Sequence, residues 1–274
     1  MSVKEILTVV TPQSMAADKL AIAVARACGA HVTLAAVAGG VMTPVFASGH
    51  LPAGMVTKAE TLARKQAQEA GSRFDEAARA AGIETDVAIV QDLLDRTGDE
   101  LKRRAHVSDL VVIEQSGSDP SHGEEFLLEA LLFGSGKPVL IAPAGHDRPV
   151  RLGKMLIAWN DSATAARAVG DALPLLATAD QVEIVTIAEN GDDFAAGAAG
   201  LSAYLARHAI KATHRAIEGQ GRPTGEVIDA HARASGTDLV VMGAYGRSRF
   251  REFVLGGATR SILARMSVPV LMAH

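Results

Sequence analysis

The apolar stretch SDLVVIEQ at residues 108–115 returns in the second half of the chain as TDLVVMGA at residues 237–244. The similarity extends beyond this pair. GKPVLIAPA at 136–144 matches SVPVLMAH at 267–274, EILTVV at 5–10 aligns with KMLIAW at 154–159, and RTGDEL at 96–101 matches PTGEVI at 223–228. Self-similarity of this kind indicates an internal repeat. The two halves are therefore predicted to be copies of one folding unit.

Short β-rich runs alternate with helical stretches in each copy, which predicts βαβ units and a parallel sheet. In the first copy we expect strands near 4–10, 31–37, 84–90, 109–114 and 138–142, and helices near 15–28, 56–81, 92–105 and 123–133. In the second copy we expect strands near 154–159, 181–188, 211–217, 238–243 and 269–272, and helices near 162–176, 193–208, 223–235 and 257–266.

The expected fold class is α/β, with two tandem doubly wound domains at 1–145 and 151–274. Each domain is predicted to hold a five-stranded parallel sheet of order 3-2-1-4-5, with helices on both faces. The join between them, PAGHDRPVRLG at 143–153, has the Pro/Gly/charged composition of a linker.

Composition excludes several classes of protein. The chain has 274 residues, a formal net charge of −4 and only 4% aromatic residues. No domain-wide basic footprint suggests a nucleic-acid partner, and no segment reads as a membrane span or a leader peptide. The single cysteine, Cys28, excludes an intramolecular disulfide framework. We expect a soluble cytoplasmic protein without a nucleic-acid or membrane partner.

Glycines gather in the stretch GAYGRSRFREFVLGGATRS at 243–261, directly after the apolar run 239–242. In a doubly wound sheet, ligands bind at the carboxyl ends of the strands, between the first and fourth strands of this unit. The glycines open onto that crevice and lead into a helix whose free N–H groups and dipole favour an anion. Thr259 adds a hydroxyl in the first turn. The pattern predicts a phosphate site.

The spacing of Gly243, two residues, Gly246, nine residues and Gly256 resembles the G-2x-G-9x-G-(S/T) pattern of the ATP-binding universal stress protein family. The ending LGGATRSILARMSVPVLMAH is similar to that of the same family, and the resemblance covers both halves as a tandem pair. It implies an adenine nucleotide, ATP with or without Mg, bound in the second half. The expected binding residues are Asn160, Ile187, Gly243, Gly246, Arg247, Gly256, Gly257, Ala258 and Thr259.

Asn160 and Gly257 depart from the family pattern. By resemblance, Asn160 stands where an Asp after the first strand holds the adenosine end, and Ile187 borders the base. The neutral amide of Asn160 weakens a charge-assisted hydrogen bond, a loss of about 1 kcal/mol. Gly257 stands in the Ser or Thr position, so a hydroxyl donor is missing while the backbone N–H remains. Both changes are expected to reduce nucleotide affinity.

Carboxylates take the place of glycines in the first half. Glu114 occupies the first glycine position, and Asp119, Glu124 and Glu125 follow nearby. Because carboxylates repel phosphate, we expect this copy to bind no ATP and to serve as a structural or regulatory partner.

The resemblance implies a stress-response protein that binds ATP and signals, with at most slow hydrolysis, because no catalytic residue or metal site is identifiable. It also implies that the last strands, 138–142 and 269–272, pair to join domains or subunits, with a homodimer as one outcome. The alternative is a scaffold or small-molecule-binding protein without nucleotide, whose apolar loop 38–54 supplies a pocket. An adenylating enzyme is disfavoured, because its phosphate loop follows the first strand, where this chain has WNDS at 159–162.

Overall fold

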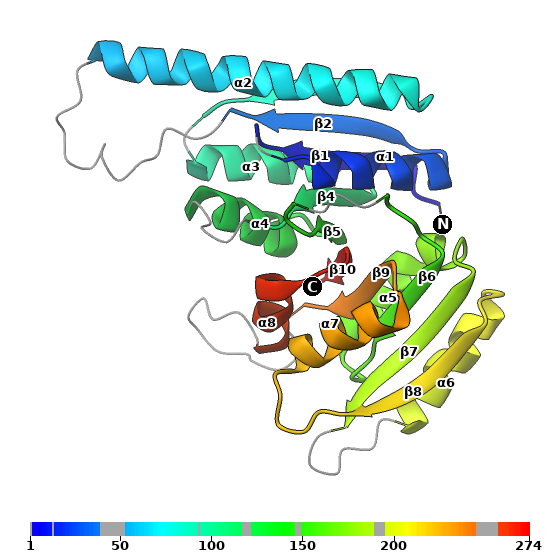
Figure 1. The fold of residues 1–274 in the computed structure, drawn as a ribbon. Coiled ribbons are helices and arrows are strands. Elements are labelled where there is room, and N and C mark those ends of the chain that lie inside the picture. The colour runs from blue at the N-terminus through cyan, green and yellow to red at the C-terminus, as the bar shows by residue number, and fades with distance from the viewer. Residues whose placement is uncertain are drawn as a thin grey trace. The chain divides into compact units, whose positions relative to one another are not determined.

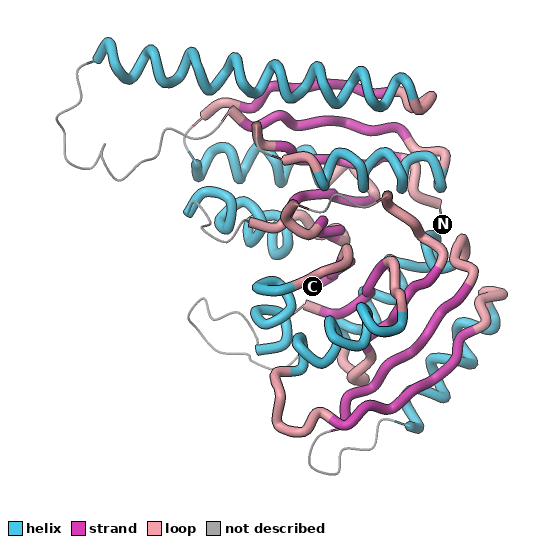
Figure 2. Tube along the Cα trace, viewed as in Figure 1, coloured by secondary structure: helices cyan, strands magenta, loops and turns pink. Residues whose placement is uncertain are grey.

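The computed structural model describes residues 2–12, 14–38, 53–92, 94–116, 122–145, 149–188, 195–244 and 257–274. The chain divides into two compact units, Val3–Asp147 and Arg148–His274. Each unit is an α/β layered structure in which strands and helices alternate along the chain (Figures 1 and 2).

The first unit follows the predicted element order. Its strands are β1 (Glu5–Val10), β2 (His31–Val37), β3 (Thr85–Val90), β4 (Leu110–Glu114) and β5 (Val139–Ala142), and its helices are α1 (Ala16–Cys28), α2 (Ala53–Ala80), α3 (Leu94–Ala105) and α4 (His122–Gly134). The strands pair in parallel in the order β3-β2-β1-β4-β5. This confirms the predicted 3-2-1-4-5 sheet.

The second unit repeats the arrangement. Its strands are β6 (Lys154–Ala158), β7 (Gln181–Ala188), β8 (Ala212–Glu218), β9 (Leu239–Gly243) and β10 (Val270–Ala273), and its helices are α5 (Ala163–Leu176), α6 (Ala195–Arg207), α7 (Thr224–Ser235) and α8 (Gly257–Arg265). Parallel pairing gives the order β8-β7-β6-β9-β10, so the first strand of this unit also lies between its second and fourth strands. The predicted ranges in both units agree with these bounds to within three residues.

Right-handed crossovers place the first two helices of each unit on one face of its sheet and the last two on the other. Accordingly, α3 packs against α4 and α7 against α8, whereas α1 and α5 pack directly on the central strands. The central strands are buried on both faces, which explains their nearly continuous apolar runs, whereas most residues of the edge strands β3 and β8 are half-buried or exposed. In β1, for example, Ile6, Leu7, Val9 and Val10 are each at most 1% exposed.

An aspartate just before the fourth strand fixes the start of the first strand in both units. Asp109 Oδ2 accepts hydrogen bonds from the backbone N–H groups of Lys4 and Glu5, at 2.7 and 3.0 Å. Asp238 Oδ2 does the same for Gly153 and Lys154, at 3.0 and 2.8 Å. The repeated Asp-Leu-Val-Val therefore does two things: its Asp binds the start of the first strand, and its apolar residues form the buried fourth strand.

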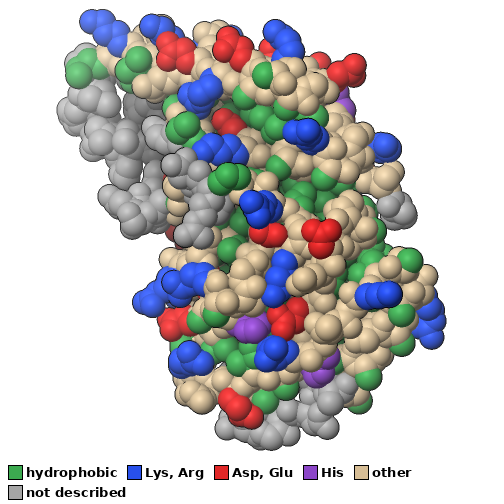
Figure 3. Space-filling view, turned by 45° about the vertical axis from the view of Figure 1, so that its right-hand side comes forward, with side chains coloured by type: hydrophobic (Ala, Val, Ile, Leu, Met, Phe, Trp, Pro, Cys, Tyr) green, Lys and Arg blue, Asp and Glu red, His purple; other side chains and the backbone are tan. Residues whose placement is uncertain are grey.

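Charged side chains of both signs are interspersed over the face of the molecule in Figure 3. On α2 they form pairs one turn apart, Lys65 with Glu69 and Arg79 with Asp75. Within the described ranges, no helix is long and apolar enough to cross a membrane. The apolar loop 38–54, which the alternative function uses, lies outside the described residues except at its ends.

Candidate functional site

The carboxyl ends of β6 and β9 lie side by side in the second unit, because Ala158 is paired with Met242. Asn160 follows the first of these strands by two residues, and Gly243 ends the second. β9 and β10 are parallel, so the helix between them, α8, must begin near the same end of the sheet. The topology therefore gathers Asn160, Gly243 and the start of α8 at one edge, as the sequence predicted for a doubly wound sheet.

Gly243 lies against the first turn of α5. A Cβ built on Gly243 would come within 2.5 Å of the Ala165 backbone nitrogen and 2.6 Å of the Thr164 carbonyl carbon. Real Cβ atoms essentially never approach backbone so closely. Glycine is thus required here by helix packing, a reason that the sequence analysis did not identify.

We expect Gly243→Ala to lower the free energy of unfolding by about 1 to 3 kcal/mol, the usual cost of forcing a methyl group into a packed contact. The change in thermal or denaturant midpoint measures this cost. Gly170→Ala, within helix α5 against which Gly243 packs, is the control, because a Cβ built there meets no described atom within 4 Å. Equal stability of the two variants would contradict the packing role.

A hydrogen-bonded chain links Asn160 to the start of α5. Asn160 Oδ1 accepts a hydrogen bond from Ser162 Oγ at 2.7 Å, and Ser162 Oγ accepts one from the Ala165 N–H at 3.2 Å. Ser162 is the N-cap of α5. With its oxygen used in this way, the exposed Asn160 side chain presents its amide N–H₂ group, a hydrogen-bond donor, at this edge.

Asp161, between these two residues, has a left-handed backbone with φ of 55°. This region is uncommon for residues other than glycine, although Asp and Asn enter it more readily than most. The Asp161 carboxylate lies against α6, 3.0 to 3.2 Å from a Cβ built on Gly197. The sharp turn directs the chain from β6 into α5 and points this carboxylate toward α6.

The first turn of α8 contains Gly257, Ala258 and Thr259 and no acidic residue. Gly257 is exposed, and a Cβ built on it would meet no atom of the described part of the chain within 4 Å. The Thr259 side chain is only 2% exposed, so it faces the protein interior and not the solvent. The groups that this turn offers to a ligand are therefore backbone N–H groups, which favour an anion together with the helix dipole.

A second glycine, Gly225 in α7, fixes the position of α8. Its N–H donates to Ser261 Oγ at 3.1 Å, and a Cβ built on it would come within 2.5 Å of the Ile262 backbone nitrogen. Gly98 occupies the matching place in α3, where a Cβ would come within 2.9 Å of the Phe126 ring of α4. The Thr-Gly pair at 97–98 recurs at 224–225, so both units place a glycine where these two helices cross closely.

Of the other predicted site residues, Ile187 lies half-buried near the carboxyl end of β7, paired with Ile217 of β8. Gly246, Arg247 and Gly256 lie outside the described residues.

The corresponding edge of the first unit carries carboxylates. Glu114 ends β4 as Gly243 ends β9, and its Oε2 accepts hydrogen bonds from the N–H groups of Met15, Ala16 and Ala17, at 2.9, 2.9 and 3.3 Å. Glu124 and Glu125 stand in the first turn of α4. Burial and the neighbouring Glu114 raise the pKa of Glu124. The N–H groups at the start of α1 are thus used by a protein carboxylate. Asp119 lies outside the described residues.

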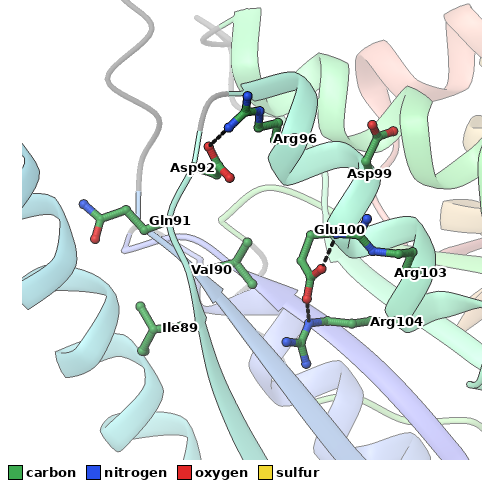
Figure 4. A pocket seen from close by; sticks show the side chains of 9 residues that line it. All are labelled: Ile89, Val90, Gln91, Asp92, Arg96, Asp99, Glu100, Arg103 and Arg104. Carbon is green, nitrogen blue, oxygen red and sulfur yellow. Dashed lines mark hydrogen bonds and ion pairs between the residues drawn. The ribbon is translucent and has the colours of Figure 1, made fainter.

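A pocket of about 470 Å³ lies elsewhere in the first unit, between the end of β3 and α3. It is lined by Ile89, Val90, Gln91, Asp92, Arg96, Asp99, Glu100, Arg103 and Arg104. Figure 4 shows that its arginines are paired within the pocket: Arg96 faces Asp92 at 3.9 Å, and Glu100 binds both Arg103 and Arg104, at 2.6 and 2.8 Å. Each of its three arginines is thus paired with a carboxylate of the same pocket.

Within the described residues, no group of three or more His, Cys, Asp or Glu side chains is placed to hold a metal ion.

Known proteins resemble this chain in sequence and in fold. The model of the universal stress protein family matches residues 152–274. Universal stress protein Slr1230 of Synechocystis is 25% identical over 169 residues, which span 60% of this chain and 57% of that protein.

Two solved structures share the two-unit fold. The structure of a universal stress protein from Archaeoglobus fulgidus has a TM-score of 0.72 at 16% identity, covering 97% of each chain. That of a putative universal stress protein from Pseudomonas aeruginosa has a TM-score of 0.64 at 16% identity, covering 99% of this chain and 93% of that one. At 16% sequence identity, this similarity shows a shared fold.

Proposed function

Because this chain belongs to the universal stress protein family, with the family domain at residues 152–274, we propose that its second unit binds ATP at the carboxyl ends of β6 and β9. The protein would act in a stress response by binding and signalling. The first unit, predicted at 1–145, would bind no nucleotide and would serve as a structural or regulatory partner.

One observation carries the assignment to the second unit: the two copies differ in charge at matching positions. In the second unit the fourth strand ends in Gly243, and the helix that follows begins at Gly257 with no acidic residue in its first turn. In the first unit the same two places hold Glu114 and the pair Glu124 and Glu125. An anion is favoured by the first arrangement and repelled by the second.

The roles proposed for the residues come from the family pattern, together with the placement of those residues that the structure describes. The phosphates would lie on the backbone N–H groups of Gly257, Ala258 and Thr259, with Gly246, Arg247 and Gly256 expected beside them from the motif. The Asn160 amide would hold the adenosine end, and the chain near Ile187 would border the base. Mg²⁺, where present, would arrive with the nucleotide phosphates.

Slow ATP hydrolysis is also part of the proposal. The described residues of the site provide backbone N–H donors and one side-chain amide, but no general base. We expect ATP turnover far below the typical enzyme rate of about 10 per second. Phosphate release by the purified chain measures it. Turnover of several per second that is lost in a Gly257 variant would identify an enzyme.

Competition among ligands tests which part of the nucleotide is recognised. We expect ATP to bind the full chain more tightly than either adenosine or inorganic triphosphate, because the proposed site contacts both the adenosine end and the phosphates of ATP. Calorimetric titration with each ligand in turn measures this. Binding of none of them at millimolar concentration would contradict the proposal and would favour the scaffold function. Pairing through the last strands, a homodimer and a cytoplasmic location remain predictions.

A further inference from the structure

A buried carboxyl group lies at the start of α1 in the first unit, apart from the proposed nucleotide site. Asp18, in the first turn of α1, is only 8% exposed. Its Oδ1 atom is fully buried and has no hydrogen-bond partner among the residues that the structure describes. An ionised carboxylate that is buried without such a partner is costly, so the protonated form is favoured.

Among the described residues, the charges that influence the Asp18 carboxyl are those of Arg73 of α2 and Glu114 of β4. Glu114 is already bound by three backbone N–H groups at the start of α1. The Arg73 guanidinium donates to the Ser14 carbonyl oxygen, at 3.4 Å, just before the same helix. Glu124 of α4 faces Glu114 in turn. Three carboxyl groups and one arginine therefore meet at this end of the sheet.

Burial raises the pKa of the Asp18 carboxyl to about 7, from an ordinary value of 3.8; Arg73 opposes the shift and Glu114 adds to it. Near neutral pH the group can therefore exchange its proton with solvent. Its ionised form would place a second carboxylate beside Glu114 and within the influence of the nearby cation.

We propose that Asp18 is a proton-responsive switch of the first unit: its ionisation draws the Arg73 guanidinium from the Ser14 carbonyl and loosens the start of α1 from Glu114. The released proton goes to solvent. Arg73 can follow the new charge because it is exposed and its bond to Ser14 is long. Below neutral pH the start of α1 remains held on Glu114. The first unit would thus respond to pH even though it binds no nucleotide.

The test follows the Asp18 carboxyl by carbon NMR in the full chain labelled at its aspartates, with Asp18→Asn removing the resonance. We expect a titration midpoint near pH 7. Removing the cation in Arg73→Gln should raise the midpoint, and removing the neighbouring charge in Glu114→Gln should lower it, each by at least about half a pH unit. These two variants identify the same resonance if Asp18→Asn fails to fold. Asp95→Asn, which changes an exposed aspartate in the first turn of α3, should leave the curve unchanged.

Hydrogen exchange at the N–H groups of Ala16 and Ala17 reports the movement itself. After correction for intrinsic exchange, opening should be several-fold more frequent at pH 8 than at pH 6, and this difference should vanish in Asp18→Asn. An Asp18 midpoint below about pH 5, no response of the midpoint to either neighbour, or equal opening at both pH values would overturn the proposal.

Discussion

Replacing Gly257 by aspartate is expected to weaken ATP binding by the full chain at least tenfold. A carboxylate about 5 Å from a phosphate costs roughly 1 to 3 kcal/mol in a partly hydrated site, and 1.4 kcal/mol is one decade in affinity. Among the residues that the structure describes, the new side chain meets no obstacle, because a Cβ built at Gly257 has none of their atoms within 4 Å. An acidic residue in the first turn also stabilises a helix by about 0.3 to 1 kcal/mol. Affinity should therefore fall while stability is kept or rises.

Two matched variants at the same position separate charge from size. Gly257→Asn adds nearly the same side chain without charge and should change affinity much less than the aspartate. Gly257→Ser restores the hydroxyl of the family pattern and should improve binding by about 0.5 to 1.5 kcal/mol. Calorimetric titration gives the affinities, and thermal melts check folding. If aspartate and asparagine weaken binding equally, the phosphates do not lie at the start of α8.

Asp18→Asn is expected to stabilise the first unit at pH 8 and to leave its stability nearly unchanged at pH 4. The pKa of the Asp18 carboxyl is about 7 in the folded chain, against an ordinary 3.8. A raised pKa means that the folded state holds the proton more tightly, so stability present below pH 4 is lost as pH rises toward 7. Each pKa unit corresponds to 1.36 kcal/mol, which sets a gain of about 2 to 4 kcal/mol for the neutral amide at pH 8.

Denaturant unfolding of the full chain at both pH values, followed by probes in each unit, measures this gain. Asp95→Asn is again the control, since the exposed Asp95 should give no such pH-dependent gain. A gain for Asp18→Asn that is equal at pH 4 and pH 8 would mean that the effect is unrelated to ionisation.

The fold was predictable because the sequence patterns that indicate it are local and occur twice, once in each half of the chain. Buried parallel strands need apolar runs on both faces, so stretches such as Leu239–Gly243 are visible in the sequence, and the repeat supplies the same signals twice. The alternation of strands and helices predicted a parallel, doubly wound sheet, and the structure confirms the order 3-2-1-4-5 expected for it. That strand order also predicted that Asn160 and Gly243 lie at the same edge of the sheet.

The contacts that shape the site were not predictable, because they join residues far apart in the chain. Nothing in the local pattern shows that Gly225 lies on the backbone of α8, or that Glu114 binds the start of α1 across 97 to 99 residues. The burial of the Thr259 side chain likewise depends on how α8 packs. The sequence predicted that Asn160, Gly243 and the start of α8 lie at this edge of the sheet, and packing decides which of their atoms face outward.

The central claim, that one unit of this chain binds ATP and the other does not, is tested most directly by the stoichiometry of ATP binding. Calorimetric titration of the full chain should give one site per chain, and the site should be lost in Gly257→Asp and kept in Glu114→Gln. Two sites per chain, no site at millimolar ATP, or a single site that survives Gly257→Asp unchanged would contradict the account.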